Sequence, residues 1–124
     1  MDAPENFEII DGRAAYRPVG DVSLARVIRM VTDAITCARE RNCREILIVT
    51  TALTGFESPS ITERYFFVQE WVLASGGAVR VAMVVRPDMI DPRKFGVTVA
   101  ANRGLTAEVF ASAEEAVAWL DGFK

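Results

Sequence analysis

The sequence contains no histidine among its 124 residues. This absence excludes Ser-His-Asp and Cys-His catalysis, and it excludes every zinc site that uses imidazole as a ligand. The glycine-based motifs Gly-x-x-x-x-Gly-Lys-Ser/Thr, Gly-x-Gly-x-x-Gly and Gly-x-Ser-x-Gly are missing too. Any catalysis would have to use carboxylate, lysine, tyrosine or hydroxyl groups. We therefore expect that the chain is not an enzyme and that it holds no cofactor and no metal.

Cysteine is scarce, with Cys37 and Cys43 as the two cysteines. They form neither a Cys-x-x-Cys pair nor the framework of a small secreted protein, so we expect two reduced thiols in a cytoplasmic protein. The start of the chain, MDAPENFEII, lacks the basic residues and the apolar run of a signal peptide. No stretch approaches the roughly 18 apolar residues of a membrane span. We expect no membrane insertion.

The composition is typical of a folded domain, with 51% hydrophobic and 25% charged residues. A chain of this length can build one hydrophobic core without a metal or a disulfide. The formal net charge of −3 disfavours general binding to nucleic acid or to an anionic membrane surface. The composition thus predicts a single domain that does not bind nucleic acid.

Hydrophobic runs place the strands. Ile46 to Val49 is apolar without alternation, which is typical of a strand covered on both faces at the centre of a parallel sheet. Ala78 to Val85 has the same character, and Thr106 to Ala111 is a shorter candidate. Near the start, Phe7 to Ile10 and Arg13 to Val19 read as two strands of a hairpin. The dipeptide Asp11-Gly12 between them suits its tight turn.

Capping residues and helical periodicity place four helices between and after the strands. The first begins at Asp21 or Ser23 and ends near Asn42. The second begins at Ser58, with Pro59 at its first position, or at Ser60, with Glu63 completing a capping box, and it ends at Gly76-Gly77. The third runs from Asp91-Pro92 to Gly104, and the last begins with a capping box of Ser112 and Glu115.

The elements follow the order β-β-α-β-α-β-α-β-α. Alternating strands and helices after an initial hairpin predict an α/β fold, with a mostly parallel mixed sheet flanked by helices. On the second helix, one face is expected to pack inward, comprising Ile61, Tyr65, Val68, Trp71 and Val72. Phe66 and Leu73 point the other way. We favour a neighbouring element that covers them; if they are exposed, a homodimer through this helix is the first hypothesis.

Three segments carry a family resemblance: LTGFESPSITERYFF after the central strand, then NRG, and VFASAEEAVAWL near the end. With the order of elements, they resemble the STAS domain, named for sulfate transporters and anti-sigma-factor antagonists, and especially its SpoIIAA-like bacterial branch. The resemblance covers essentially the whole chain, residues 1–124. It implies a non-enzymatic regulatory module that binds a protein partner.

The resemblance also implies where a partner docks, namely the loop and helix start at residues 54–66. The side chains expected to contact it are Thr54, Phe56, Glu57, Ser58, Ser60 and Phe66. The family switches docking by phosphorylation in an Asp-Ser-Ser/Thr-Gly motif, where this chain has Glu57-Ser58-Pro59-Ser60. Pro59 replaces the usual phosphoacceptor, and Ser58 matches the first hydroxyl. Ser58 and Ser60 are candidate phosphorylation sites, although we prefer the interpretation that both cap the helix.

A related branch resembles lipid-carrying SEC14-type proteins and implies a second hypothesis, a small molecule, lipid or anion held at the carboxyl ends of the central strands. Its candidate hydroxyls, apolar walls and cations are Thr50, Thr51, Thr54, Ser58, Phe56, Tyr65, Arg86, Arg93, Lys94 and Arg103, provided that the loops converge. A third hypothesis, acid-base chemistry by Glu57, Glu63 and Asp88, is not favoured because carboxylates are also ordinary at helix starts.

Overall fold

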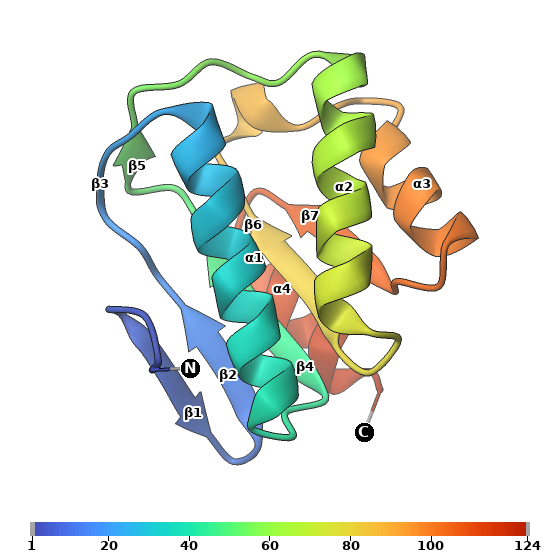
Figure 1. Cartoon of the computed structure of the whole chain (residues 1–124). Coiled ribbons are helices and arrows are strands. Elements are labelled where there is room, and N and C mark those ends of the chain that lie inside the picture. The colour runs from blue at the N-terminus through green and yellow to red at the C-terminus, as the bar shows by residue number, and fades with distance from the viewer. Residues whose placement is uncertain (1, 124) are drawn as a thin grey trace.

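A mixed sheet lies at the centre of the protein, in a computed structural model that describes residues 2–123 (Figure 1). Within those residues the sheet has five strands in the order β1-β2-β4-β6-β7. They are β1 (Phe7–Ile10), β2 (Arg13–Tyr16), β4 (Glu45–Val49), β6 (Arg80–Val84) and β7 (Ala107–Phe110). β1 pairs antiparallel with β2, and each later pairing is parallel. The prediction of an α/β fold with a mostly parallel mixed sheet is confirmed.

The hairpin turn between β1 and β2 forms where the sequence indicates. Asp11 and Gly12 have φ values of 52° and 79°, the left-handed conformation that a two-residue turn requires. The second strand was expected to continue to Val19, but β2 ends at Tyr16. Pro18 lies two positions later and has no amide hydrogen to donate to a ladder, which is consistent with the earlier end.

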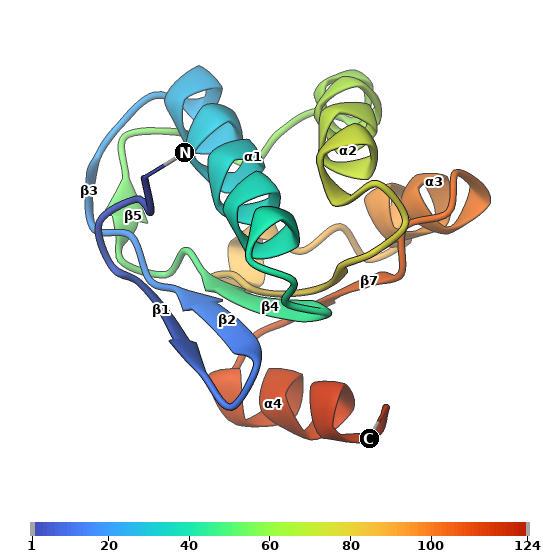
Figure 2. The ribbon, with the colours of Figure 1, turned by 60° about the horizontal axis from the view of Figure 1, so that its bottom comes forward.

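The helices are distributed unequally over the two faces of the sheet. Because β2, β4, β6 and β7 follow one another across the sheet without reversing, right-handed crossovers place every connecting helix on the same face. These helices are α1 (Leu24–Glu40), α2 (Ile61–Ser75) and α3 (Phe95–Asn102). In the described part of the chain, α4 (Ala113–Asp121) alone covers the opposite face (Figure 2).

The central strand, β4, contributes side chains to both hydrophobic cores. Ile46 and Ile48 are fully buried in the larger core under α1, α2 and α3. Leu47 points to the other face and packs with Ala116 and Leu120 of α4 in the smaller core. The alternation that a strand imposes thus buries consecutive residues on opposite faces, which confirms that Ile46 to Val49 is an interior strand.

Serine side chains begin three of the four α-helices in residues 2–123. Of the two candidate starts for α2, Ser60 is the N-cap, and its capping box with Glu63 is complete. Ser23 caps α1 by accepting from the amide of Arg26. The Ser112 hydroxyl accepts a hydrogen bond from the amide of Glu115 and donates one to the Glu115 carboxylate. The carboxylate does not accept from the Ser112 amide, so the expected capping box is only half formed.

The third helix begins later than expected, at Phe95 instead of Pro92. Asp91 still acts at its start, because its carboxylate accepts from the amides of Arg93 at 3.2 Å and Phe95 at 2.8 Å. Lys94, the residue before the helix, has φ 50°. The residues between Asp91 and Phe95 form a turn that precedes the helix.

Short elements between the main ones have no clear signal in the sequence. β3 (Gly20–Asp21) pairs in parallel with β5 (Leu53–Thr54), and η1 (Pro87–Met89) is a 3₁₀ turn after β6. All three lie in connections near the carboxyl ends of the parallel strands (Figure 1). None of the helices in residues 2–123 is both long and apolar enough to cross a membrane.

Candidate ligand-binding site

An apolar cavity of about 120 Å³ lies between the sheet and the helices that cover it. Its floor is formed by the sheet, through Val81, Met83 and Val85 on and after β6 and through Ala107 and Val109 on β7. The helices close it from above, with apolar side chains from α1, α2 and α3. These side chains are Leu24, Val27, Ile28, Phe67, Val68, Trp71, Val97 and Ala100.

The cavity lies where the side chains of α2 and α3 leave space unfilled above β6 and β7. Phe67 and Trp71 on α2 pack on each other, with ring centroids 4.6 Å apart. The indole nitrogen of Trp71 donates to the main-chain oxygen of Ile28 at 3.4 Å, which directs this aromatic pair toward α1. On the α3 side, Gly96 supplies no side chain, and a Cβ there would lie 3.3 Å from Val68. The space between these contacts remains unfilled.

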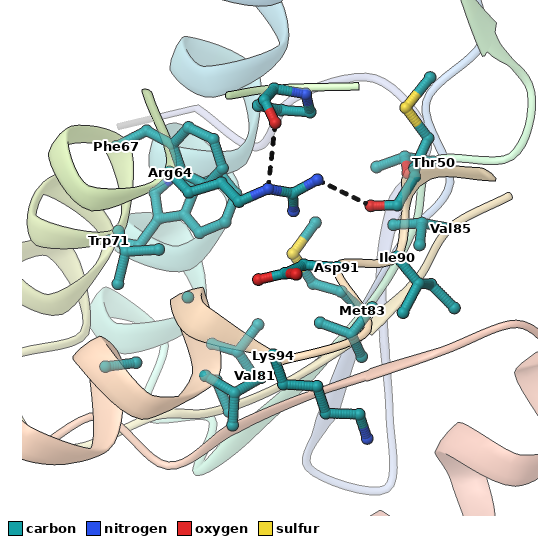
Figure 3. A pocket seen from close by; sticks show the side chains of 18 of the residues that line it. Thr50, Arg64, Phe67, Trp71, Val81, Met83, Val85, Ile90, Asp91 and Lys94 are labelled. Carbon is teal, nitrogen blue, oxygen red and sulfur yellow. Dashed lines mark hydrogen bonds between the residues drawn. The ribbon is translucent and has the colours of Figure 1, made fainter. Parts of the chain in front are cut away.

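The polar mouth is organised by Arg64 of α2, which spans two loops (Figure 3). Its guanidinium donates to the main-chain oxygen of Pro59 at 3.1 Å and to the hydroxyl of Ser58 at 2.9 Å. It also donates to the main-chain oxygen of Met89 at 3.2 Å. One side chain therefore joins the loop before α2 to the turn after β6, and both segments border the cavity.

Three more charged groups stand at the mouth: Asp91, Lys94 and Glu108. Asp91 has a pKa held below its usual range, mainly by the amide of Phe95, then by that of Arg93, with the positive charge of Arg64 contributing less. The Nζ atom of Lys94 is 3.0 Å from the carboxylate of Glu108 on β7. Arg64 and Lys94 are thus matched by two carboxylates, so the mouth has no net excess of either charge.

The residues predicted to bind a small ligand converge only in part. Thr50, Phe56 and Lys94 line the cavity. The other expected ligands are not on its wall; they are Thr51, Thr54, Ser58, Tyr65, Arg86, Arg93 and Arg103. Arg86 instead donates to the main-chain oxygen of Leu53 at 3.1 Å, and Arg103 donates to the hydroxyl of Tyr65 at 3.1 Å. The predicted cationic cluster does not form.

Most of the residues predicted to dock a partner are at the surface. Thr54, Glu57, Ser58 and Ser60 are exposed, and Phe56 is half-buried against the larger core. Phe66 is on α2 and points to solvent. The hydroxyls of Ser58 and Ser60 are already engaged, the first by Arg64 and the second by the amide of Glu63. As expected, the loop that follows the central strand is accessible.

Two expectations for α2 are wrong. Ile61 was placed on the inward face, but it is 58% exposed because it sits on the first turn, beyond the sheet. Phe67 is buried in its place as the helix is rotated so that Phe67, Val68 and Trp71 face the core. Phe66 and Leu73 were expected to be covered by a neighbouring element, but their side chains are 64% and 77% exposed. No described element lies over them.

The residue with the most contacts at the mouth, Arg64, was not among the predicted site residues. Arg64 lies on the first turns of α2, and nothing in its local pattern distinguishes it from a solvated surface arginine. The carboxylates of the third hypothesis, Glu57, Glu63 and Asp88, are all exposed; Glu63 belongs to the capping box, and Asp88 is 3.7 Å from Arg86. They do not face one another across the cavity, whose lining includes none of them.

In the described residues, no group of three or more His, Cys, Asp or Glu side chains is placed to hold a metal ion. No protein-family model matches the chain, and no curated protein matches it at a significant level. Function has to be inferred from the residues of the site themselves.

Proposed function

We propose that the protein binds a small, mainly apolar molecule in the cavity between the sheet and α2 and α3. The observation that supports this is the cavity itself, whose walls are almost entirely aliphatic and aromatic and whose mouth carries a few polar groups. Binding sites for small molecules commonly combine such an apolar interior with a few placed polar groups. This proposal favours the small-molecule hypothesis over the regulatory hypothesis.

The volume limits the ligand. About 120 Å³ is slightly less than the roughly 150 Å³ of an engineered apolar cavity that stays dry and binds benzene. The cavity therefore accepts a ring or a short acyl segment. The two acyl chains of a phospholipid would require α3 or the Pro87–Met89 turn to move away from the sheet.

The charges at the mouth limit the head group. Arg64 is occupied by three hydrogen bonds to the loops, and Lys94 is paired with Glu108. An anionic head group would have to compete with these contacts, so its charge adds little to affinity. The apolar tail supplies most of the binding free energy, at about 0.8 kcal/mol for each buried methylene.

The test is a series of ligands that share one tail: hexanol, hexanoate and hexylammonium, titrated into labelled protein and followed by NMR. We expect saturable shifts at Trp71, Met83 and Val109, with dissociation constants on the order of 0.1–1 mM that differ little among the three. Replacing Ala107→Leu fills the cavity and should weaken binding at least tenfold. Ala101→Leu, on the exposed side of α3, is the matched control and should leave affinity unchanged.

Two results would reject the proposal. One is a titration without saturable shifts at the cavity residues. The other is equal affinity in the Ala107→Leu and wild-type proteins, provided that the variant melts as cooperatively as the wild type. A strong preference for hexanoate would instead show that the mouth acts as an anion site.

A second function, regulation by docking a protein partner through residues 54–66, is supported by one specific observation. The loop exposes Glu57, Ser58 and Ser60, and hydrogen bonds from Arg64 and in the α2 cap restrain it. A preorganised loop loses little entropy on binding. Photo-crosslinking from Glu57 in living cells, with Glu114 on α4 as the control position, tests it. A discrete adduct formed from position 57 alone supports docking, and identical patterns from both positions reject it.

A further inference from the structure

Four residues form an outward stripe along α2, and the face opposite them is the one that packs on the sheet. They are Thr62, Phe66, Gln69 and Leu73. At 100° per residue, they cluster about 180° from Phe67, Val68 and Trp71, which are buried. Leu73 and Phe66 are among the exposed large hydrophobic side chains, so this helix face carries two large apolar groups that nothing covers in the described chain.

The Phe66 ring already has one aromatic contact within its own chain. It meets the ring of Tyr65 edge to face, with centroids 5.6 Å apart. The Tyr65 hydroxyl in turn accepts a hydrogen bond from Arg103 at 3.1 Å. An exposed aromatic ring that already has such a contact loses less rotamer freedom when it is covered, which favours its use as a contact.

We propose that α2 packs antiparallel against α2 of a second copy of this chain. The two-fold axis passes between Gln69 and Glu70, midway between Phe66 and Leu73 in the sequence. Phe66 of each copy then lies against Leu73 of the other, and both large side chains are covered by the same contact. An isologous interface of this kind closes as a dimer.

Charge complementarity supports the antiparallel direction. Arg39 of α1 lies beside the end of α2, with its guanidinium 3.4 Å from the main-chain oxygen of Leu73 and in the space where a Cβ of Gly76 would stand. Glu63 is exposed at the start of α2, on the flank that faces α1. In the antiparallel pair, Glu63 of one copy comes opposite Arg39 of the other, twice. In a parallel pair, these groups remain at opposite ends of the helices and do not meet.

Glu70 opposes the contact. It lies beside the two-fold axis, so the carboxylates of the two copies approach each other and repel. With this repulsion and a stripe of only two large apolar side chains, the interface belongs to the small class that gives weak, transient complexes. The dimer is therefore expected in concentrated protein and is dissociated on dilution.

The experiment is analytical ultracentrifugation of the full chain from micromolar to millimolar concentration. We expect a monomer-dimer equilibrium that Leu73→Lys weakens at least tenfold and Glu70→Gln tightens several-fold. Both positions are exposed on the helix surface, so the fold is expected to survive, which circular dichroism checks. A protein that stays monomeric at millimolar concentration, or a dimer that neither substitution changes, overturns the proposal.

Cross-linking tests the direction independently. With a short bis-maleimide, Gln69→Cys should give a covalent dimer, because the two copies of this position meet at the axis. Thr62→Cys should not, because its two copies are about 22 Å apart along the helices in the antiparallel pair. The native Cys37 and Cys43 are buried and should not react. Cross-linking through both engineered positions would indicate a parallel pair and overturn the antiparallel assignment.

Discussion

The Arg64 guanidinium on α2 donates a hydrogen bond to the main-chain oxygen of Met89, 3.2 Å away at the end of η1. The two residues belong to connections on either side of β6, and the bond closes them over the mouth of the apolar cavity (Figure 3). Since the same guanidinium also holds Ser58 and Pro59, the accessible loop and the turn above the cavity are mechanically one unit. A ligand that displaces the turn must first weaken this contact.

Arg64→Ala should therefore loosen both segments. Hydrogen bonds to a charged group contribute about 1.5–3 kcal/mol when well buried. Because Arg64 is only half-buried, we expect a loss of about 1–2 kcal/mol in the free energy of unfolding, measured by urea denaturation. Amide hydrogen exchange should accelerate in residues 56–60 and 87–91 more than in the sheet.

The control for this substitution is Arg29→Ala on the outer face of α1. Arg29 is exposed, and the structure gives it no hydrogen bond or ion pair within residues 2–123. Arg29→Ala should change the free energy of unfolding by less than about 0.5 kcal/mol. Amide hydrogen exchange in residues 56–60 and 87–91 should be unchanged. Equal effects from the two substitutions would contradict the role assigned to Arg64.

Glu45 is a buried carboxylate at the amino end of the central strand, 7% exposed. The parallel register places it beside Arg13 of β2 and Arg80 of β6, at 2.8 Å and 3.4 Å. Glu45→Ala would leave two partly buried arginines without their shared partner. We expect the free energy of unfolding to fall by about 2–4 kcal/mol. This is less than the effect of breaking a fully buried ion pair, because Arg80 is partly exposed.

Glu8→Ala provides the comparison for Glu45→Ala. Glu8 pairs with Arg17 at 3.2 Å, but both side chains are more than half exposed, so water screens the pair. Urea denaturation should show a change below about 0.5 kcal/mol for this variant. If both variants lose the same free energy of unfolding, the buried contacts of Glu45 with Arg13 and Arg80 stabilise the fold no more than the exposed pair does.

Asp91 should titrate at unusually low pH. Main-chain amides of Phe95 and Arg93 donate to its charged form, which lowers the pKa. A carboxyl whose pKa is lower in the folded state stabilises the fold above its unfolded value of about 3.9, and this stabilisation is lost as the pH falls through the folded value. An NMR titration of the Asp91 carboxyl should therefore give a midpoint below 3.9. The Asp91→Asn variant should lose less of its free energy of unfolding than the wild type does as the pH is lowered. A midpoint at or above the usual value would contradict the capping geometry.

Cys43 should be unreactive in the folded protein. Its side chain is buried, and burial is the main cause that raises the pKa of the thiol, followed by the nearby Cys37. The thiolate is the reactive form, so a raised pKa and restricted access both slow modification. At pH 8 we expect no reaction with dithionitrobenzoate in buffer and two thiols titrated in guanidinium chloride, in agreement with the two cysteines of the chain. Rapid labelling of the native protein would show that this end of β4 opens readily.

Local chemistry in the sequence was sufficient to predict most elements. Runs such as Ile46 to Val49 identify buried strands, and Ser112 identifies a helix start, while Ser23 and Ser60 were each one of two candidate caps. Each signal acts within a few residues of where it is read. The turn at Asp11-Gly12 follows from the same kind of local rule. Where two local rules competed, as at Ser58 and Ser60, the pattern alone did not choose.

Long-range placement decided the rest. That α1, α2 and α3 share a face follows from the order in which the strands line up, and the exposure of Phe66 and Leu73 depends on what that arrangement leaves uncovered. Arg64 meets Met89 only because the sheet brings two connections together, and the cavity is lined by residues of three helices and two strands that only the fold brings together. The sequence by itself determined the main strands and helices and the short list of residues that could cap them, since those depend on neighbours along the chain. The tertiary structure alone determined the cavity and its mouth, since these depend on contacts between residues distant in sequence.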